Sequence, residues 1–237
     1  MFTASAELYD TIYASFKDYG AEADRIAALL RAAHPACRTV LDVGCGTGEH
    51  ARLLTARGYQ VDGVDLDPGL LRVAARKNPA SRFHEADMCA FAIGGRYDAV
   101  LCLFGTIAYA KSIERVVQAL TCARGHLAAG GLVVVEPWLT PEAVRPGDTP
   151  SLTVESPPLR VVRTSHLDVA GRMARLTFEY DVSGPDGTTH ATEHHELGLF
   201  TVEEMMAAFA AAKLSASYDP AGLTGRGLYL GRASEET

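Results

Sequence analysis

The feature that most constrains the fold is the stretch from Thr39 to Glu49, which reads TVLDVGCGTGE. A short apolar, β-leaning run at residues 40–43 leads directly into glycines at positions 44, 46 and 48, and a helix-compatible stretch follows. A strand, a glycine-rich loop and a helix form the opening unit of a parallel α/β sheet that binds a nucleotide-like ligand at the carboxyl edge of its strands. Glycine is needed there because a ligand lying against the backbone leaves no room for a Cβ atom.

The spacing of these glycines separates two kinds of ligand. The dinucleotide fingerprint is G-x-G-x-x-G, whereas this chain has G-x-G-x-G, with Asp42 two residues before the first glycine. That arrangement resembles motif I of the class I S-adenosylmethionine (SAM) methyltransferases, whose ligand carries a zwitterionic amino acid and no phosphate. The spacing disfavours a nicotinamide oxidoreductase, and a tight strand–helix turn without any ligand is the simplest alternative.

Composition excludes several other classes of protein. The formal net charge is −7 over 237 residues and no Lys- or Arg-rich run is present, so nucleic acid is not expected as a partner. The five cysteines are scattered and form no C-x-x-C pair, so we expect neither a disulfide framework nor a metal site. Because no signal peptide and no apolar run of membrane-spanning length is present, we expect a cytoplasmic protein without membrane contact.

The segments that follow the glycine loop continue a β/α alternation. Residues 61–66 predict a second strand, and Asp65 near its end lies about twenty residues beyond the loop, where doubly wound folds place a carboxylate that accepts both ribose hydroxyls of an adenosine. A solvated acid at a strand end is the simpler reading. Asp67 is a candidate N-cap for the next helix, with Pro68 in its first turn. A third short strand, residues 82–86, leads to Asp87 and Met88, where a SAM enzyme presents an acid and an apolar side chain to adenine.

Two further strands carry candidate substrate contacts. The continuous apolar run at residues 97–104 predicts a central parallel strand, and the loop after it presents Thr106 and Tyr109. Residues 113–131 predict an amphipathic helix closed by glycines, and LVVVEPW is the fifth strand, which delivers Glu136 and Trp138 to the same edge.

The pattern changes after Thr140. Residues 141–158 contain five prolines and predict a loop, and three partly alternating stretches between residues 159 and 200 predict an antiparallel meander. A capped helix beginning at Thr201 and two short strands complete the chain. We therefore expect one SAM-binding domain, residues 1–140 and 201–237, and an inserted substrate-covering subdomain, residues 141–200.

The N-terminal segment has two readings. Tyr9, Tyr13 and Tyr19 lie on a short helical stretch that is followed by an amphipathic helix ending at His34 and Pro35. The tyrosines either pack in an ordinary core or form a flap that closes over the cofactor.

Taken together, these motifs resemble the amino-sugar N-methyltransferases of antibiotic biosynthesis, and in particular those that dimethylate the 3-amine of a nucleotide-linked deoxysugar. The resemblance covers nearly the whole chain: YD-x-x-Y and KDY, LDVGCGTG-x-H, HEADM, VVVEPW, the R-x-SH pair of the meander, HELGLF and TGRGL. It implies a Rossmann-like α/β fold with a seven-stranded, mostly parallel sheet, SAM as cofactor, and a nucleotide-linked aminosugar as small-molecule substrate. Two departures lie beside the acceptor: a shorter spacing between Tyr13 and Lys17, and Gly105-Thr106 in place of paired serines.

The resemblance also implies roles for individual residues. The cofactor contacts are expected at Tyr9, Lys17, Asp42, Gly44, Cys45, Gly46, Asp65, Leu66, Asp87, Met88 and Leu103. The substrate contacts are expected at Tyr13, Thr106, Trp138, Arg163 and Arg226, and the catalytic candidates are Tyr109, His166, His195 and Glu136, with His194 as a further proton acceptor. No metal is expected.

The expected reaction is in-line attack of a neutral amine on the sulfonium methyl group of SAM, for which orientation alone supplies about 7–11 kcal/mol of the barrier. An unperturbed phenol, with a pKa of about 10, is a poor base. We therefore expect Tyr109 to position the amine. An O- or C-methyltransferase of another small metabolite, or a SAM-binding regulator without catalysis, would share the cofactor residues. The acceptor, the number of methyl groups and a homodimeric state are left open.

Overall fold

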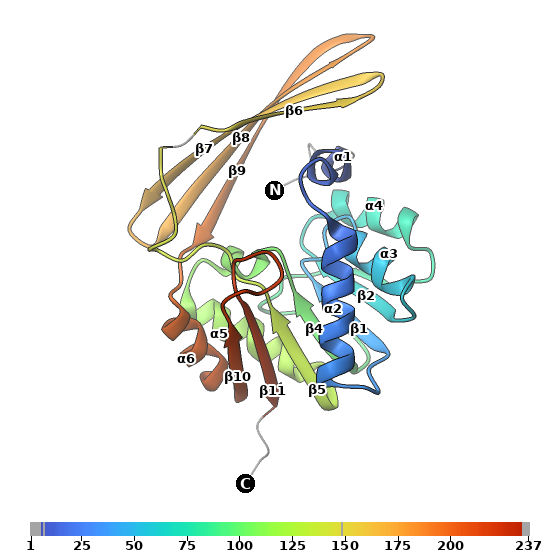
Figure 1. The fold of residues 1–237 in the computed structure, drawn as a ribbon, viewed down its shortest axis with the longest axis vertical. Helices are drawn as coiled ribbons and strands as arrows, with labels where there is room; N and C mark the ends of the chain where they lie inside the picture. The colour runs from blue at the N-terminus through green and yellow to red at the C-terminus, as the bar shows by residue number, and fades with distance from the viewer. Residues whose placement is uncertain (1–5, 7, 148, 234–237) are drawn as a thin grey trace.

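The computed structural model describes residue 6, residues 8–147 and residues 149–233. Figure 1 shows two sheets, a larger one flanked by helices and a smaller one that stands above one edge of it. The larger sheet has the order β10-β11-β5-β4-β1-β2-β3. Its strands are β1 (Thr39–Val43), β2 (Gln60–Asp65), β3 (Phe83–Glu85), β4 (Tyr97–Cys102), β5 (Leu127–Val135), β10 (Leu214–Asp219) and β11 (Leu228–Ala233). Strands β1 to β5 are parallel, whereas β11 is antiparallel to both of its neighbours. The predicted seven-stranded, mostly parallel sheet is confirmed.

Strand β1 lies at the point where the strand order reverses, because β2 and β3 follow on one side of it and β4 and β5 on the other. In open α/β sheets the ligand binds at the carboxyl ends of the strands beside such a point. The glycine loop that follows β1 therefore lies where the topology places a ligand.

Two hydrophobic clusters cover the two faces of the larger sheet because side chains alternate along each strand. Val40 faces a cluster with helices α2 (Tyr19–Ala33) and α3 (Glu49–Thr55), whereas Leu41 faces the opposite cluster with α5 (Ile113–Gly125) and α6 (Val202–Ala211). Helix α4 (Pro68–Lys77) begins at the N-cap Asp67, and α6 begins with a capping box at Thr201, as predicted. No helix within the described part of the chain combines the length and the apolarity that crossing a membrane requires.

The smaller sheet is antiparallel, with the order β6-β7-β8-β9. Its strands are β6 (Ser151–Ser156), β7 (Leu159–Ala170), β8 (Met173–Gly184) and β9 (Gly187–Gly198). One of its faces packs against the N-terminal helix α1 (Tyr9–Ala14), where Val161, Phe178 and Tyr180 contact Ile12 and Tyr13.

Two predictions of element boundaries are wrong. The segment 141–158 is not only a loop, because the prolines flank residues 151–156 and leave this stretch free to pair with β7 as an edge strand. The predicted helix 113–131 ends at Gly125, and residues 127–131 already belong to β5. A Cβ atom at Gly131 would lie 3.0–3.1 Å from backbone oxygens, so the glycine permits close strand packing and does not close the helix.

Candidate active site

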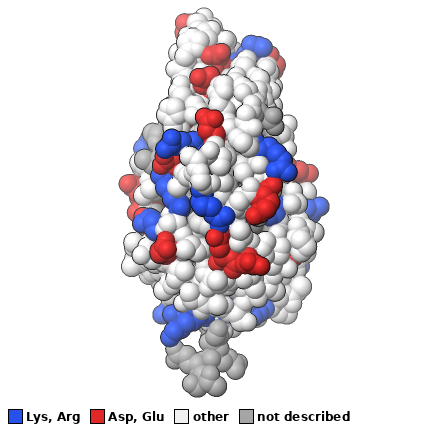
Figure 2. Space-filling view, turned by 90° about the vertical axis from the view of Figure 1, so that its left-hand side faces the viewer, with Lys and Arg blue, Asp and Glu red and all other residues white. Residues whose placement is uncertain are grey.

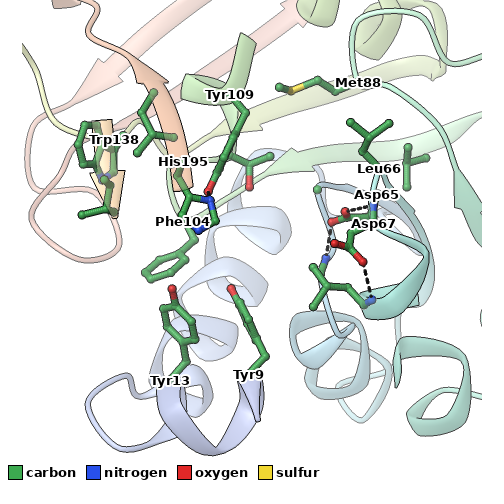
Figure 3. Close-up of a pocket in the computed structure, with 18 of the residues that line it drawn as sticks. Tyr9, Tyr13, Asp65, Leu66, Asp67, Met88, Phe104, Tyr109, Trp138 and His195 are labelled. Carbon is green, nitrogen blue, oxygen red and sulfur yellow. Dashed lines mark hydrogen bonds between the residues drawn. The ribbon is translucent and has the colours of Figure 1, made fainter. Parts of the chain in front are cut away.

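A cavity of about 370 Å³ lies between the carboxyl edge of the larger sheet and the inner face of the smaller one. Helix α1, the loops that follow β1, β2, β4 and β5, strands β7 to β9 and the loop between β10 and β11 all contribute side chains to it. Figure 3 shows these side chains converging from both sheets and from α1.

The floor of the cavity is the glycine loop with the end of β2. Asp65 accepts hydrogen bonds from the backbone N–H groups of Gly46 at 2.8 Å and Asp67 at 2.9 Å, so one carboxylate fixes both loops (Figure 3). A Cβ atom at Gly44, whose φ is +74°, would lie 2.1 Å from the methyl group of Thr106, so only glycine fits there. Burial raises the pKa of Asp65, and the backbone N–H groups partly offset this effect.

Asp42 lies in the strand that leads to this loop and is almost completely buried, at 2% exposure. The pKa of its carboxyl group is raised to about 6, mainly by burial; His50 lowers the pKa and Asp65 raises it. Its Oδ2 atom has no hydrogen-bond partner among the described residues. Such a group destabilises the empty protein and favours a cationic partner.

One end of the cavity has apolar walls and an acidic rim. Leu66, which is 55% exposed, Leu70 and Met88 line it, and Asp87 lies beside them. Although burial raises the pKa of Asp87, hydrogen bonds from the Cys89 N–H and the Arg115 guanidinium, at 2.9 and 2.7 Å, hold it below its usual range. A slot of this kind suits a flat, amino-substituted aromatic ring.

The centre of the cavity contains a Tyr109–His195 pair. The Tyr109 hydroxyl lies 3.0 Å from Nδ1 of His195, and His195 Nε2 lies 3.8 Å from the buried carboxylate of Glu193. Burial raises the pKa of Tyr109 well above its usual value, so the phenol stays protonated at neutral pH. Tyr9 and Tyr13 of α1 are stacked, with centroids 4.3 Å apart, and face the pair from the other side (Figure 3).

The other end carries two arginines surrounded by aromatic rings. The Arg163 guanidinium lies 5.5 Å from the rings of Tyr13 and Phe16 and 4.7 Å from that of Phe178. Its Nε and Nη1 atoms are buried without hydrogen-bond partners in the part of the chain that the structure describes. The Arg226 guanidinium lies 4.9 Å from the ring of Phe104. Buried guanidinium nitrogens without acceptors, as at Arg163, fit an anionic ligand.

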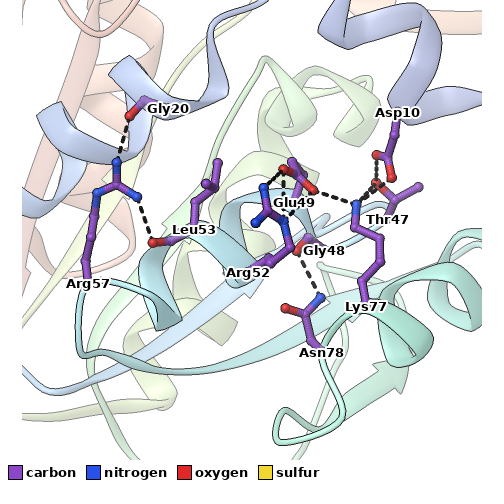
Figure 4. A network of polar contacts seen from close by, with 10 residues as sticks. All are labelled: Asp10, Gly20, Thr47, Gly48, Glu49, Arg52, Leu53, Arg57, Lys77 and Asn78. Carbon is purple, nitrogen blue, oxygen red and sulfur yellow. Dashed lines mark hydrogen bonds and ion pairs between the residues drawn. The ribbon is translucent and has the colours of Figure 1, made fainter.

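Helix α1 is fastened to the glycine loop by a polar network, shown in Figure 4. Asp10 accepts hydrogen bonds from Thr47 and Lys77, and Lys77 also lies 2.7 Å from Glu49. Of the two readings of the N-terminal tyrosines, this placement favours the flap for Tyr9 and Tyr13, which line the cavity, whereas Tyr19 packs against His50.

Most of the predicted site residues come together in this cavity. The lining includes Tyr9, Gly44, Gly46, Asp65, Leu66, Asp87 and Met88 from the cofactor set, all five of the substrate set (Tyr13, Thr106, Trp138, Arg163 and Arg226), and Tyr109 and His195.

Seven predicted residues do not line the cavity. Lys17 is ion-paired with the buried Glu22, and Asp42, Cys45 and Leu103 are buried beneath the surface of the cavity. Glu136 is fully buried below its wall. His166 lies on the outer face of the smaller sheet beside Glu179, as does His194 beside Thr177. The reason is the two-residue period of a strand, which puts His166 on the face opposite Arg163.

Sequence reasoning missed several side chains of the lining. They are mainly Phe16, Asp67, Phe104, Arg115, Leu176, Phe178 and Leu197. Phe104 directly follows β4 at the active edge and could have been found by its position. Leu176 and Phe178 have no such signal, because which face of β8 turns inward depends on tertiary packing.

The surface and the polar clusters give further constraints. On the face shown in Figure 2, acidic and basic side chains are interspersed around the middle of the molecule, so this face has no continuous basic surface for a phosphate backbone. Among the described residues, no three His, Cys, Asp or Glu side chains are grouped as metal ligands would be.

The proteins that are similar to this chain are methyltransferases. A family model described as a methyltransferase domain matches residues 40–131. The chain is 41% identical, over 95% of its length and 89% of the relative, to dTDP-3-amino-3,6-dideoxy-alpha-D-glucopyranose N,N-dimethyltransferase of Streptomyces fradiae. It is 34% identical, over 95% of its length and 91% of the relative, to dTDP-4-amino-2,3,4,6-tetradeoxy-D-glucose N,N-dimethyltransferase of Saccharopolyspora spinosa.

Solved structures agree with these relatives. The crystal structure of Streptomyces venezuelae DesVI superimposes with a TM-score of 0.92 at 35% identity, covering 97% of this chain and 98% of DesVI. SAM-bound CalS10, an amino pentose methyltransferase from Micromonospora echinaspora, superimposes with a TM-score of 0.85 at 35% identity, over 94% of this chain and 95% of CalS10. The glycine loop, the acid at the end of β2 and the full-length similarity agree: the chain belongs to the SAM-dependent N,N-dimethyltransferases that act on nucleotide-linked aminosugars.

Proposed function

We propose that this enzyme transfers methyl groups from SAM to the ring amine of a deoxysugar that is linked to a nucleoside diphosphate. The observation that carries the proposal is the order of groups along one cavity. An apolar slot and the glycine loop lie at one end, the Tyr109–His195 pair lies in the middle, and Arg163 and Arg226 lie at the other end. That order matches a sulfonium cofactor, an amine and a diphosphate in sequence.

The cofactor end fits SAM on the residues present. Asp65 would accept the ribose hydroxyls, and Leu66 and Met88 would enclose the adenine ring. Asp42, which is buried beneath the cavity surface, would favour the cationic ligand through its charge and not through direct contact. Bound SAM supplies an electrophilic methyl group on its sulfonium. The task of the protein is then to hold the acceptor nitrogen in line with that group.

The acceptor amine must be neutral to attack, and the aromatic cavity favours the neutral form because burial lowers the pKa of an amine. Tyr109, whose phenol stays protonated, would orient the nitrogen through a hydrogen bond while its other contact goes to His195. Orientation thus replaces strong base catalysis. His166, which lies on the outer face of the smaller sheet, has no part in this mechanism.

The arginines would bind the diphosphate through charge-assisted hydrogen bonds. Arg163 supports this assignment best, since two of its N–H groups are buried and unpaired among the described residues, which is unfavourable unless a ligand supplies acceptors. The relatives named above act on 3-amino and 4-amino sugars, so the similarity does not select the ring position.

The inserted subdomain, residues 141–200, would cover the acceptor, and residues 1–140 and 201–237 would form the SAM-binding domain. The packing of β7 and β8 against α1 supports this division, since it encloses the acceptor end. A cytoplasmic location and a homodimer are predictions that cell fractionation and sedimentation velocity would test.

The decisive experiment incubates the protein with SAM and a panel of dTDP-linked 3-amino and 4-amino deoxysugars, with the corresponding free sugars as controls. We expect S-adenosylhomocysteine and mass gains of one and two methyl groups on nucleotide-linked acceptors only. Equal kcat/KM for a nucleotide sugar and its free sugar would remove the role of Arg163 and Arg226. Absence of turnover with every amine would refute the proposal.

A further inference from the structure

A buried carboxylate below the acceptor end of the cavity joins two loops that each carry a side chain of the site. Glu136 directly follows β5 and is 0% exposed. Its Oε2 atom accepts a hydrogen bond from the backbone N–H of Phe104 at 2.8 Å, and its Oε1 atom accepts one from the Thr224 hydroxyl at 2.6 Å. Phe104 belongs to the loop after β4, and Thr224 to the loop between β10 and β11. Both oxygens are therefore occupied by protein donors, which leaves Glu136 no direct access to a substrate.

The hydrogen bond from the Phe104 N–H to Glu136 stabilises an unfavourable backbone conformation at Phe104. Phe104 has a φ of +54°, in the left-handed region that aromatic residues avoid, and Gly105 after it has a φ of +76°. The backbone carbonyl of Glu136 also accepts the N–H of Gly105, at 3.2 Å. One residue thus fixes the main chain of this loop at two successive positions. Such strain persists only where surrounding groups over-determine the conformation.

The consequence of this conformation is the position of the Phe104 ring, which two cations flank. The Arg226 guanidinium lies 4.9 Å from its centroid and Lys17 Nζ lies 4.0 Å from it. Arg226 comes two residues after Thr224, so the Thr224–Glu136 bond fixes the Arg226 loop against the loop that carries Phe104. No hydrogen bond or ion pair holds the Arg226 guanidinium itself within the described ranges, so its placement depends on Phe104 and on its own backbone.

We propose that Glu136 and Thr224 are positioning residues that set the place of Arg226 for the acceptor, and that Glu136 is not a proton acceptor. The proposal rests on the proposed function, in which Arg226 binds the diphosphate. Loss of the Thr224–Glu136 bond should weaken binding of the acceptor nucleotide, while SAM binding at the other end of the cavity and the methyl transfer step change little.

The test compares Thr224→Val, which removes the hydroxyl but keeps the shape, with Thr224→Ser, which keeps the hydroxyl. A matched control is Thr39→Val, because Thr39 also donates its hydroxyl to a carboxylate, that of Asp98 at 2.9 Å, but at the opposite end of the sheet. The loop should stay folded in Thr224→Val, since the buried Leu223 and a hydrogen bond from Arg25 to its carbonyl anchor it independently.

We expect Thr224→Val to raise the Kd for thymidine diphosphate and the KM for the aminosugar nucleotide about tenfold, because a displaced Arg226 would bind the diphosphate more weakly by about one hydrogen bond. The kcat and the Kd for SAM should stay within about twofold of wild type, and Thr224→Ser should restore the acceptor KM. Amide hydrogen exchange at Gly225, whose N–H bonds the carbonyl of Ala221, should become faster in Thr224→Val only.

The proposal is overturned if Thr224→Val changes acceptor binding no more than Thr39→Val does, or if SAM binding falls equally. Failure of the proposed function looks different, because wild-type protein would then neither bind thymidine diphosphate nor methylate any aminosugar. The hydrogen-exchange measurement needs no substrate, so it tests the Thr224–Glu136 bond even if the proposed function is wrong. Unchanged exchange at Gly225 would overturn the role of the Thr224–Glu136 bond, and faster exchange would support it.

Discussion

Replacing Asp42 with asparagine should stabilise the protein in the absence of SAM, and the gain should depend on pH. Burial is the main cause that raises the pKa of this carboxyl group from 3.8 to about 6. Because the folded pKa is above the unfolded one, the native state binds more protons between about pH 4 and pH 6, and stability falls as the pH rises through that window. At about 1.4 kcal/mol per pH unit, ionised Asp42 costs about 3 kcal/mol above pH 7. Asparagine keeps the shape of the side chain and removes this cost.

The assay is urea unfolding of wild type and Asp42→Asn, without SAM, at pH 4, 5 and 8. We expect the variant to gain about 0.5 kcal/mol at pH 4, about 1.5 at pH 5 and about 3 at pH 8. Asp98→Asn is the matched control of opposite sign. Although burial raises the pKa of Asp98, hydrogen bonds from Thr39 and Arg38 lower it overall. Its loss should therefore destabilise the protein at neutral pH and matter less as the pH falls. A gain at Asp42 that is constant with pH, or a loss at pH 8, would refute the reasoning.

Three further variants test the site. Tyr109→Phe should lower kcat by far less than about a hundredfold, because the phenol of Tyr109 does not act as a base. A larger loss in single-turnover assays with intact acceptor binding would overturn the positioning role. Arg163→Met should weaken thymidine diphosphate binding about a hundredfold in calorimetry, because two charge-assisted hydrogen bonds are lost. Arg160→Met, which breaks an exposed ion pair on the other face of β7, should leave this binding unchanged. Equal effects of the two substitutions would contradict the assignment. Asp65→Asn should weaken SAM binding about ten- to a hundredfold, because an amide has one acceptor oxygen where the carboxylate has two. Unaltered SAM affinity would exclude the predicted ribose contact.

The sequence by itself determined most of the cofactor half of the molecule. Three glycines at alternate positions after an apolar run, and an acid about twenty residues later, are local signals, because the turn and the close ligand approach depend on the backbone of a few consecutive residues. The parallel topology then brings the strand ends together, so Asp65, Asp87 and Met88 reach one cavity as expected. Cap residues such as Asp67 and Thr201 are similarly local.

Only the tertiary structure decided which residues of the meander, and which proton-acceptor candidates, belong to the acceptor half. Whether a residue of the meander faces the cavity depends on its strand register, and a shift of one residue turns every side chain to the other face. This is why Arg163 and His195 line the cavity while His166 and His194 do not, although Arg163 and His166 belong to the same short motif and His194 directly precedes His195. Glu136 could not be assigned from the sequence either, because its role depends on Phe104 and Thr224, which are 32 and 88 residues away and meet only when the sheet is formed.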